Sequence, residues 1–510
     1  MTCRSKLLIL AVSCLLLLAL DARGAAASSD LPNPAALRPQ VEFWKTVFAV
    51  YSEHQVLIHD SEHLDRVYTV LDYREEAEAG THPVALERMR HQGVDAEKRR
   101  IRLLLLRLQS KGPDTTGLTK EERAIRALFD GDRDPRRFAK AAEPDRIRAQ
   151  RGLKERFREG VRVSRRYLPT MERIFADEGL PKELTRLPLV ESCFDIDAYS
   201  KVGAAGIWQF MPATGRQYMR VDGVVDERRD PLRATRAAAR HLTGDHAALG
   251  TWPLALTAYN HGAGGVRRAV RTMGTTDIAR IVRGYRGPRF GFASRNFYVE
   301  FLAAVEVERE YRSHFGDLSF DPPFGGDEVR LRHAVSSKAA ATCAGVSVSD
   351  LATLNPAVDA GVFHRGRNLP AGYVLRVPAG SSGSFERRLA AVPASRRVVA
   401  APRAGTHRVA RGQTLSHIAS RYGVSVGALQ RANALRGTTI RVGQTLRIPA
   451  KGGAAQRQAV AAVRTHRVQR GQTLSHLASR YGVSVRELQR ANSLRSTTVR
   501  AGQVLRIPAS

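Results

Sequence analysis

The spacing of apolar and polar positions changes along this chain of 510 residues, and each spacing predicts a different element. Behind Arg4 and Lys6, positions 7–20 form one run of apolar and small residues. A positive start, a short apolar segment and small residues near Ala27 are typical of a cleaved secretory signal peptide, predicted as positions 1–27. An uncleaved membrane anchor is the alternative, whereas lipid attachment at Cys14 is disfavoured because this cysteine lies inside the run. No later run is long and apolar enough to span a membrane.

The next region, residues 35–175, carries apolar residues at mostly helical spacing. Its clearest segments are VEFWKTVFAVYSEHQVLIH at positions 41–59 and IRLLLLRLQ at positions 101–109. Charged residues alternate with apolar ones throughout, and we find no chemical motif in the region. We therefore expect a helical N-terminal region that packs as a scaffold against the domain that follows.

Helical spacing after position 179 places a carboxyl group beside an apolar stripe. Four apolar residues follow one another at steps of four, three and three: Leu180, Leu184, Leu187 and Val190. They share one helix face, which Phe194 extends, so Glu191 lies close to this stripe at the end of the helix. Poor solvation raises the pKa of a carboxyl group, and a raised pKa suits a general acid. By spacing alone, however, an ordinary solvated glutamate is the better interpretation.

A repeat with a unit of about 45 residues fills the C-terminal fifth of the chain. Its units are residues 406–450 and 465–510, and residues 451–464 between them have the composition of a flexible basic linker. In each unit, the strand-like phrases HRV and LRIP flank two helical patterns that a glycine joins. The predicted order is strand, helix, helix, strand.

Composition limits the partners of the chain. Lys+Arg 81 against Asp+Glu 49 gives a net charge of +32, which favours a polyanion, a membrane surface or a cell-wall polymer. A hydrophobic fraction of 43% excludes wholesale disorder. After removal of the signal peptide only Cys193 and Cys343 remain, and they fit neither a disulfide framework nor a Cys-x-x-Cys metal site. Two buried free thiols are expected.

The repeat segment LSHIASRYGVSVGALQRAN resembles a DNA-binding helix-turn-helix. The signal peptide and the strands that bracket each helix pair argue against DNA, so no nucleic acid partner is expected. The phrases GQTL and LRIP recur in both units, which closely resemble the LysM module, a βααβ domain that binds glycans containing N-acetylglucosamine. That resemblance implies glycan binding at eight positions: Gly412, Thr414, Leu415, Asn433, Gly471, Thr473, Leu474 and Asn492.

A third, degenerate LysM-like copy is predicted at residues 326–378. It repeats several offsets of the two units, from Gly345 to Pro378, but lacks the GQTL phrase. A spacer with a LysM-like fold is therefore expected there. Residues 379–405 are rich in Ser, Ala, Pro and Arg and are expected to form a linker.

Small and aromatic residues follow Glu191 in close succession. Ser200 precedes Gly-Ala-Ala-Gly at positions 203–206, and the phrase IWQFMP follows directly. Small residues let a backbone approach a ligand or a helix closely. Gln209, between two aromatic residues, would be costly to bury without a partner. Farther on, AYNHGAG at positions 258–264 follows another apolar helix pattern.

The phrases VES, S-x-x-G-A-x-G-I-W-Q-F-M-P-x-T-G-R, VDERRDP and AYNHGAGGV, in this order, resemble the soluble-lytic-transglycosylase catalytic domain. The nearest resemblance is to the membrane-bound lytic murein transglycosylase D family, whose members carry C-terminal LysM modules. The likeness covers residues 176–312 and implies an all-α, lysozyme-like catalytic domain. The expected fold class is multidomain, with a helical N-terminal region, this catalytic domain and small α+β LysM modules.

By this resemblance, Glu191 is the catalytic acid, and six residues bind substrate in the glycan cleft: Ser200, Gln209, Met211, Tyr259, Asn260 and Tyr298. The two tyrosines are candidates for positioning the acid and the substrate. The chain also departs from the family pattern. Ser294 stands where many members have a glutamate, His261 replaces a small residue, and Cys193 and Asp195 follow the Glu-Ser pair in place of the usual residues.

The family mechanism implies that Glu191 protonates the oxygen between N-acetylmuramic acid and N-acetylglucosamine, then accepts the proton of the muramic acid C6 hydroxyl. A 1,6-anhydro sugar results, without water, metal or cofactor. A lysozyme-type hydrolase would need a second carboxylate, for which Asp195 and Asp197 lie nearest in sequence. A non-catalytic wall-binding scaffold is a further alternative. The implied partners are peptidoglycan strands in the periplasm or cell envelope, with outer-membrane association as an option and the oligomeric state open.

Overall fold

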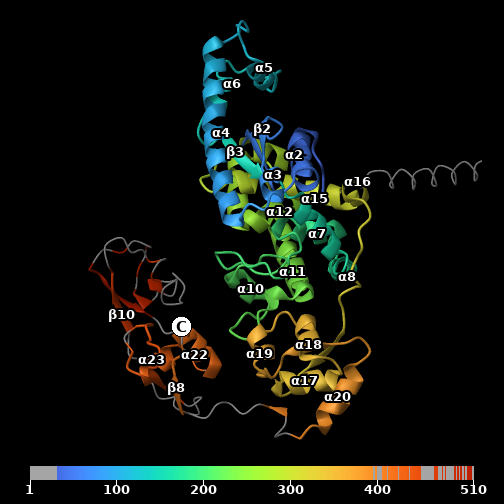
Figure 1. Cartoon of the computed structure of the whole chain (residues 1–510), viewed down its shortest axis with the longest axis vertical. Helices are drawn as coiled ribbons and strands as arrows, with labels where there is room; N and C mark the ends of the chain where they lie inside the picture. The colour runs from blue at the N-terminus through green and yellow to red at the C-terminus, as the bar shows by residue number, and fades with distance from the viewer. Residues whose placement is uncertain are drawn as a thin grey trace, which may run out of the picture. The chain divides into compact units, whose positions relative to one another are not determined.

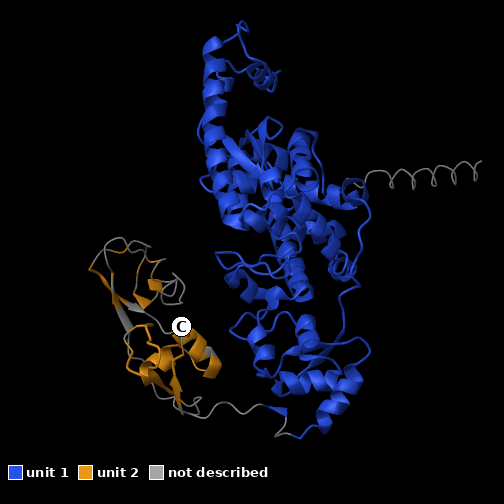
Figure 2. Ribbon diagram, viewed as in Figure 1, with its two compact units in different colours: residues 1–399 blue, residues 400–510 orange. Residues whose placement is uncertain are grey.

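A computed structural model describes residues 31–393, 397–398 and 405–449 apart from positions 411, 423, 425 and 436, together with shorter stretches between 464 and 507. The chain divides into two compact units, residues 1–399 and 400–510 (Figure 2). The predicted signal peptide and nearly all of the predicted linker at 451–464 lie outside the described residues. Within the described part, no helix has both the length and the apolar character needed to cross a membrane.

The N-terminal region combines helices with a small sheet. Its elements are η1 (Ala35–Leu37), α2 (Arg38–Ala49), β1 (Gln55–Asp60), β2 (Val67–Asp72), α3 (Arg74–Glu78), α4 (Pro83–Lys111), α5 (Lys120–Ala127), α6 (Arg137–Ala141) and β3 (Ile147–Arg151). The helical interpretation of positions 41–59 is therefore wrong in its second half, because α2 ends at Ala49 and QVLIHD forms strand β1.

The position of β1 in the sheet explains this error. The strand order is β2-β1-β3, with both pairings antiparallel, so β1 is the central strand. Its residues from Val56 to Asp60 are all buried. A strand buried on both faces has a continuous apolar run instead of the alternation of a half-exposed strand. Helix α4 packs against all three strands (Figure 1).

The catalytic region is helical, as predicted. Its elements are α7 (Lys154–Ser164), α8 (Leu168–Asp177), η2 (Lys182–Arg186), α9 (Leu187–Glu191), α10 (Pro212–Tyr218), η3 (Glu227–Arg229), α11 (Pro231–Leu249), α12 (Trp252–His261), α13 (Ala263–Met273), α14 (Ile278–Gly284), α15 (Phe292–Arg309) and α16 (Tyr311–Phe315). Helix α15 packs against α2, α12 and α9, and α11 packs against α8 and α12 (Figure 1). One apolar core joins α2 to these helices.

The segment predicted as one helix from position 180 contains two short elements, η2 and α9. Leu180, Leu184 and Leu187 are buried, in agreement with the predicted apolar stripe. Glu191 is the last residue of α9. Phe194 is buried as well, but it lies beyond the helix with a positive φ of 55°, so it does not extend the helix face.

A small α+β module follows the catalytic helices within the same unit. It contains β4 (Asp327–Arg330), β5 (Val335–Ser336), α17 (Ser337–Ala344), α18 (Val348–Leu354), α19 (Ala360–His364), β6 (Asn368–Leu369), β7 (Val374–Val377) and α20 (Ser382–Ala391). The prediction of a linker from position 379 is wrong, because α20 buries Phe385 in the core of this module. Leu389, four residues later, packs against the same core. Two apolar residues in a polar segment are too few to show in its composition.

A buried ion pair joins this module to the catalytic helices. The guanidinium of Arg376, on β7, lies 2.7 Å from the carboxylate of Asp230, and the two side chains are 2% and 1% exposed. Asp230 also caps the N-terminus of α11 by accepting hydrogen bonds from two backbone N–H groups. Nearby, the backbone N–H of Asp226 donates to the carbonyl of Ala357 at 2.7 Å. The module is thus fixed to the start of a central helix of the catalytic region.

The second unit contains the two predicted LysM repeats. The first has β8 (Gly405–Arg408), α22 (Leu415–Tyr422), α23 (Val426–Ala432) and β9 (Thr445–Ile448), with β8 and β9 paired antiparallel. This is the predicted order of strand, helix, helix, strand. In the second repeat, β10 (Arg464–Arg467) pairs antiparallel with β11 (Val504–Ile507).

Candidate active site

The chain turns sharply directly after Glu191. Cys193 and Phe194 have positive φ values of 53° and 55°, a conformation that non-glycine residues rarely adopt and that concentrates at functional sites. Gly160 of α7 lets the carbonyl of Cys193 approach, since a Cβ at position 160 would lie 2.7 Å from that oxygen. The Cys193 thiol is free, and burial raises its pKa to about 11, so it stays protonated.

Burial dominates the electrostatics of Glu191. It raises the pKa of the carboxyl group to about 8, from an ordinary value near 4.5. Among the described residues, Glu191 has no hydrogen-bond or ion-pair partner that would stabilise a carboxylate. The side chain therefore carries a proton at neutral pH, as a general acid must.

The charge of Glu191 acts on the phenol of Tyr259. Burial raises the pKa of its phenol well above 10, and the charge of Glu191 adds to this rise. Its hydroxyl donates a hydrogen bond to the carbonyl of Trp208 at 2.8 Å. Trp208 is fully buried, stacks on Phe175 and donates from its ring nitrogen to the hydroxyl of Thr235. Tyr259 thus ties the loop that follows Glu191 to helix α12.

The Gly-Ala segment forms a compact turn. The hydroxyl of Ser200 accepts a hydrogen bond from the backbone N–H of Ala204 (2.8 Å), and the amide of Gln209 donates to the carbonyl of Gly206 (2.8 Å). Gly206 has φ +71° and no room for a Cβ, which would lie 2.0 Å from the carbonyl of Arg228. Met211 is 42% exposed. Ser200 and Gln209 therefore shape the turn, while Met211 presents its side chain to solvent.

Two departures from the family pattern compensate one another. The hydroxyl of Ser294 donates to the side-chain oxygen of Asn260 at 3.2 Å, and the Nδ1 atom of His261 lies 3.0 Å from the same hydroxyl. Ser294 is buried and Asn260 is exposed. The longer His261 side chain reaches the shorter Ser294 and so restores a polar link between the end of α12 and the start of α15.

Tyr298 is not part of the cleft, which corrects the sequence prediction. Its side chain is fully buried, and its hydroxyl donates to the carbonyl of Pro32 at 2.6 Å. An α-helix turns about 100° per residue, so a residue two positions along points to about the opposite side. That residue is Glu300, and the charge of Glu191 contributes to its raised pKa of about 8, with burial as the main cause.

Glu300 was missed because it lies far from Glu191 in sequence. A signal was nevertheless present, since NFYVEFLAA places one carboxyl group in an otherwise apolar helix segment. The two carboxylates considered for a hydrolase, Asp195 and Asp197, are exposed instead. The side chain of Asp197 is 78% exposed and pairs with Arg229 at 3.2 Å. Neither aspartate is a carboxylate buried beside Glu191.

Several residues predicted to bind glycan in the LysM repeats have structural contacts. Leu415 and Leu474 lie in the apolar cores of their modules, which corrects their assignment to the glycan surface. The amide of Asn433 donates to the carbonyls of Leu429 and Arg447, and its oxygen accepts from the backbone N–H of Arg447 at 2.6 Å. Asn433 therefore joins a helix end to strand β9.

The remaining predicted LysM positions differ from one another. Asn492 donates to the carbonyl of Leu488, as Asn433 does to that of Leu429. Thr414 is exposed and accepts a hydrogen bond at the start of α22, and Gly412 forms an exposed turn with φ +82°. Gly471 and Thr473 lie outside the described residues.

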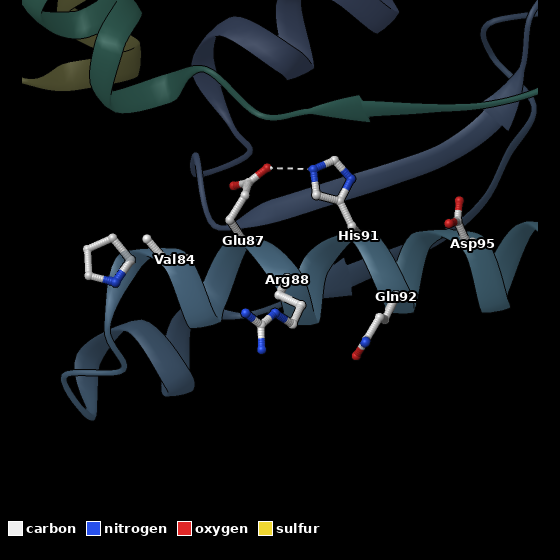
Figure 3. Close-up of a pocket in the computed structure, with 7 residues that line it drawn as sticks. Val84, Glu87, Arg88, His91, Gln92 and Asp95 are labelled. Carbon is white, nitrogen blue, oxygen red and sulfur yellow. Dashed lines mark ion pairs between the residues drawn. The ribbon is translucent and has the colours of Figure 1, made fainter.

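A hollow along α4 does not form a second reactive site. It is lined only by residues of that helix between Pro83 and Asp95. Glu87 and His91 pair at 3.2 Å, whereas Arg88 and Gln92 point to the other side of the helix (Figure 3). Polar groups that converge on one centre are the mark of a binding site, and here they diverge. In the described part of the chain, no group of three His, Cys, Asp or Glu residues is arranged to hold a metal ion.

Family models match part of the catalytic region and the modules that follow it. The Transglycosylase SLT domain matches residues 172–282, which include Glu191 and Tyr259. The LysM-like domain of the lytic transglycosylase MltD matches residues 326–394, and the LysM domain matches residues 407–449 and 466–508. A half-buried acid at the end of a short helix, in a domain that matches the SLT family, places the chain in the class of lytic transglycosylases.

The relative Membrane-bound lytic murein transglycosylase D of Escherichia coli is 34% identical over 325 residues, which cover 62% of this chain and 70% of that protein. The chain belongs to the membrane-bound lytic murein transglycosylase D family. A probable peptidoglycan endopeptidase LytE of Bacillus subtilis is 32% identical over 108 residues, covering 20% of this chain and 32% of that one. The solved structure of the lytic transglycosylase Slt of Pseudomonas aeruginosa matches with a TM-score of 0.24 and 23% identity, over 29% of this chain and 24% of that chain.

Proposed function

We propose that the protein cleaves the β-1,4 bond between N-acetylmuramic acid and N-acetylglucosamine in peptidoglycan and leaves 1,6-anhydro ends. The observation that carries this proposal is Glu191, a half-buried carboxyl group whose pKa desolvation raises to about 8, in a domain that matches the SLT family. At neutral pH such a group holds the proton that the leaving sugar needs.

The reaction proceeds in two proton transfers through Glu191. The carboxyl group first gives its proton to the glycosidic oxygen, and the bond from that oxygen to C1 of the muramic acid breaks. The C6 hydroxyl oxygen of the same sugar then bonds to C1, and its proton returns to the Glu191 carboxylate. No water is consumed and the acid is regenerated, so the reaction needs neither a metal ion nor a cofactor.

Neighbouring residues support these steps in different ways. Tyr259 is held near Glu191 by its bond to the Trp208 carbonyl, and its phenol stays neutral. It keeps the loop after Glu191 in place and can accept a hydrogen bond from the acid. Asn260 and Met211 are exposed next to this loop and are our candidates for glycan contacts, with Ser200 and Gln209 shaping the backbone that faces the sugar.

Product masses test this proposal. Sacculi digested by the wild type should release muropeptides whose termini are lighter by one water than hydrolysed, reducing termini. Glu191→Gln should release none, because it keeps the shape of the side chain but removes its titratable proton. Glu178→Gln, the same exchange at an exposed glutamate, is the matched control and should behave as the wild type. Reducing ends alone would instead establish a lysozyme-type hydrolase, and equal digestion by Glu191→Gln would reject the acid.

The LysM repeats are proposed to bring the enzyme to the wall of the cell envelope, after export by the predicted signal peptide. Two weak glycan contacts on one chain make later binding events intramolecular and raise the local substrate concentration. Deletion of residues 401–510 should therefore weaken sacculus binding at least about tenfold, while cleavage of a small soluble muropeptide stays unchanged. Pull-down with sacculi and a soluble kinetic assay measure the two effects, and equal losses in both would contradict targeting.

A further inference from the structure

Glu300, a half-buried carboxyl group, takes no part in the proposed reaction. Glu300 lies on α15, a helix that packs directly against α9, the short helix that ends in Glu191. Tyr298, two positions earlier, points away to Pro32, which leaves Glu300 on the side of Glu191. Asn296, Ala303 and Ala304 are its neighbours one helical turn away, and none of them carries a charge.

No cation among the described residues pairs with either carboxyl group, and Arg156 of α7, which packs against α9, donates to the carbonyl of Ser192 at 3.4 Å. Within the described residues, neither Glu191 nor Glu300 has a hydrogen bond or an ion pair. The cations on the helices that pack against α15 have other partners. Arg38 and Lys45 of α2 lie 2.7 and 3.1 Å from Glu306.

The other charged groups on the elements that pack against α15 do not pair with Glu191 or Glu300. On η2, Arg186 binds Glu308 and Glu172, while Lys182 is exposed. On α12, Tyr259 donates to the Trp208 carbonyl and His261 contacts Ser294. Glu42 on α2 pairs with Arg38, and Arg280 and Arg283 on α14 are exposed, as is Arg312 on α16. Tyr311 on α16 packs against Phe320 and Arg165, His314 pairs with Glu310, and Glu183 on η2 is half-buried. Among the residues that the structure describes, Glu191 is therefore the charge that contributes to the raised pKa of Glu300.

We propose that Glu300 is a positioning residue that keeps a proton on Glu191, by placing a second carboxyl group across the α9–α15 contact in a site that contains no cation. Two neighbouring carboxyl groups in such surroundings cannot both ionise easily, so a proton is retained by the pair when the pH rises. Both groups have a pKa of about 8, and the charge of Glu191 contributes to the value of Glu300. The retained proton extends the range in which Glu191 is an acid toward alkaline pH.

This inference rests on the proposed function, and a pH profile tests it. We expect the rate of release of anhydro-muropeptides by Glu300→Gln to equal that of the wild type at the acidic plateau, where Glu191 is protonated in both. On the alkaline side, the pH of half-maximal kcat/KM should fall by about one unit, because the second carboxyl group no longer holds the proton of the pair. A residue with only a packing role would change the rate at all pH values and leave the midpoint in place.

Three further variants complete the experiment. Glu300→Asp keeps the charge and should keep an alkaline midpoint close to that of the wild type. Glu310→Gln makes the same exchange at the exposed end of α15 and should change nothing. If Glu300→Gln does not fold, Glu300→Asp and Glu300→Ala must still differ in their alkaline midpoints.

Superimposable pH profiles of the wild type and the charge-removing variants would overturn the role of Glu300. That outcome is distinct from failure of the proposed function, in which the wild type itself would release no anhydro products, or Glu191→Gln would still release them.

Discussion

Two of the places in unit 1 where carboxyl groups have little contact with water differ in the positive charges around them. The small α+β module from β4 to α20 is called the third module below. At its junction with the catalytic helices, Asp230 is 1% exposed and lies 2.7 Å from the guanidinium of Arg376, with Arg233 at 3.6 Å. At the candidate active site, Glu191 and Glu300 have no cation among the described residues. Asp230 stabilises the contact between the module and the catalytic helices, whereas Glu191 and Glu300 are proposed to retain a proton.

The difference shows that burial alone does not decide what a carboxyl group does. Desolvation disfavours the charged form in both places, and a nearby positive charge or a helix N-terminus can offset it. Asp230 has both, since it also caps α11. Glu191 has neither, and as the last residue of α9 it lies at the negative end of the helix dipole, which disfavours a carboxylate. A cation beside Glu191 would therefore end its use as an acid.

The largest effect is expected on activity, when Glu191 is replaced at the site without a cation. Glu191→Gln should lower kcat on purified sacculi by about 10³-fold or more, because the general acid is lost while the shape is kept. The folded state should be as stable as the wild type at neutral pH, since a neutral amide replaces a neutral acid. Steady-state kinetics and thermal unfolding measure the two effects. A variant that is inactive because it is unfolded would say nothing in favour of the acid and would contradict the expected stability.

A large loss of stability is expected at the site with a cation. Arg376→Ala should lower the free energy of unfolding by about 3–5 kcal/mol, because Asp230 is left buried without its partner. The double variant Arg376→Ala with Asp230→Asn should recover part of this loss, since the unpaired charge is removed while a capping oxygen stays. Chemical denaturation of the full chain measures both. If the double variant is no more stable than the single one, the cost does not come from an uncompensated charge.

A smaller loss of stability is expected when an asparagine that hydrogen-bonds neutral backbone groups is replaced. Asn433 bonds the backbone of its module at three points, and Asn355 makes matching bonds to Leu351 and Arg376 in the third module. Replacement of either by Ala should cost about 1–3 kcal/mol, because backbone groups lose their partners. Binding to sacculi below the unfolding temperature should be unchanged for Asn433→Ala. A loss of binding with full stability would restore Asn433 as a glycan contact.

A further expected effect is a pH dependence of stability. The pKa of Glu300 is about 8 in the folded protein and near 4.5 when unfolded, so its protonated form favours folding. Its contribution is complete below about pH 4.5 and is lost as the pH rises through about 8. Glu300→Gln lacks this loss and should gain stability relative to the wild type over that window. Melting curves from pH 4 to pH 9 compare the two proteins, and parallel curves would contradict the raised pKa.

The order of motifs predicts more of this molecule than the periodicity of its apolar residues does. Periodicity placed Leu180, Leu184 and Leu187 in the core, yet it favoured a solvated Glu191. The Gly-Ala turn and the AYN phrase indicated the acid, and burial of Glu191 agrees with that indication. The helical catalytic region and the LysM repeats were also predicted from their phrases, because each phrase reflects local backbone geometry such as the turn at Gly206.

Features that depend on distant partners were not predictable in this way. Strand β1 was interpreted as helix because its central place in the sheet depends on β3, which begins only at Ile147. Tyr298 was preferred to Glu300 because a motif does not state which side of α15 faces α9. Helix α20 was interpreted as linker because its fit to the third module depends on one buried side chain, Phe385.

The attachment of Arg376 to Asp230 also bears on how proteins of this design exchange their parts. A recombination event between the catalytic helices and the third module would separate a base from the acid it neutralises and leave both in apolar surroundings. Such an event is disfavoured even though the sequence there resembles a boundary between domains. The LysM repeats are a different case, since each contains its own core. We expect relatives to vary in the number of terminal repeats and to inherit the catalytic helices and the third module as a single piece.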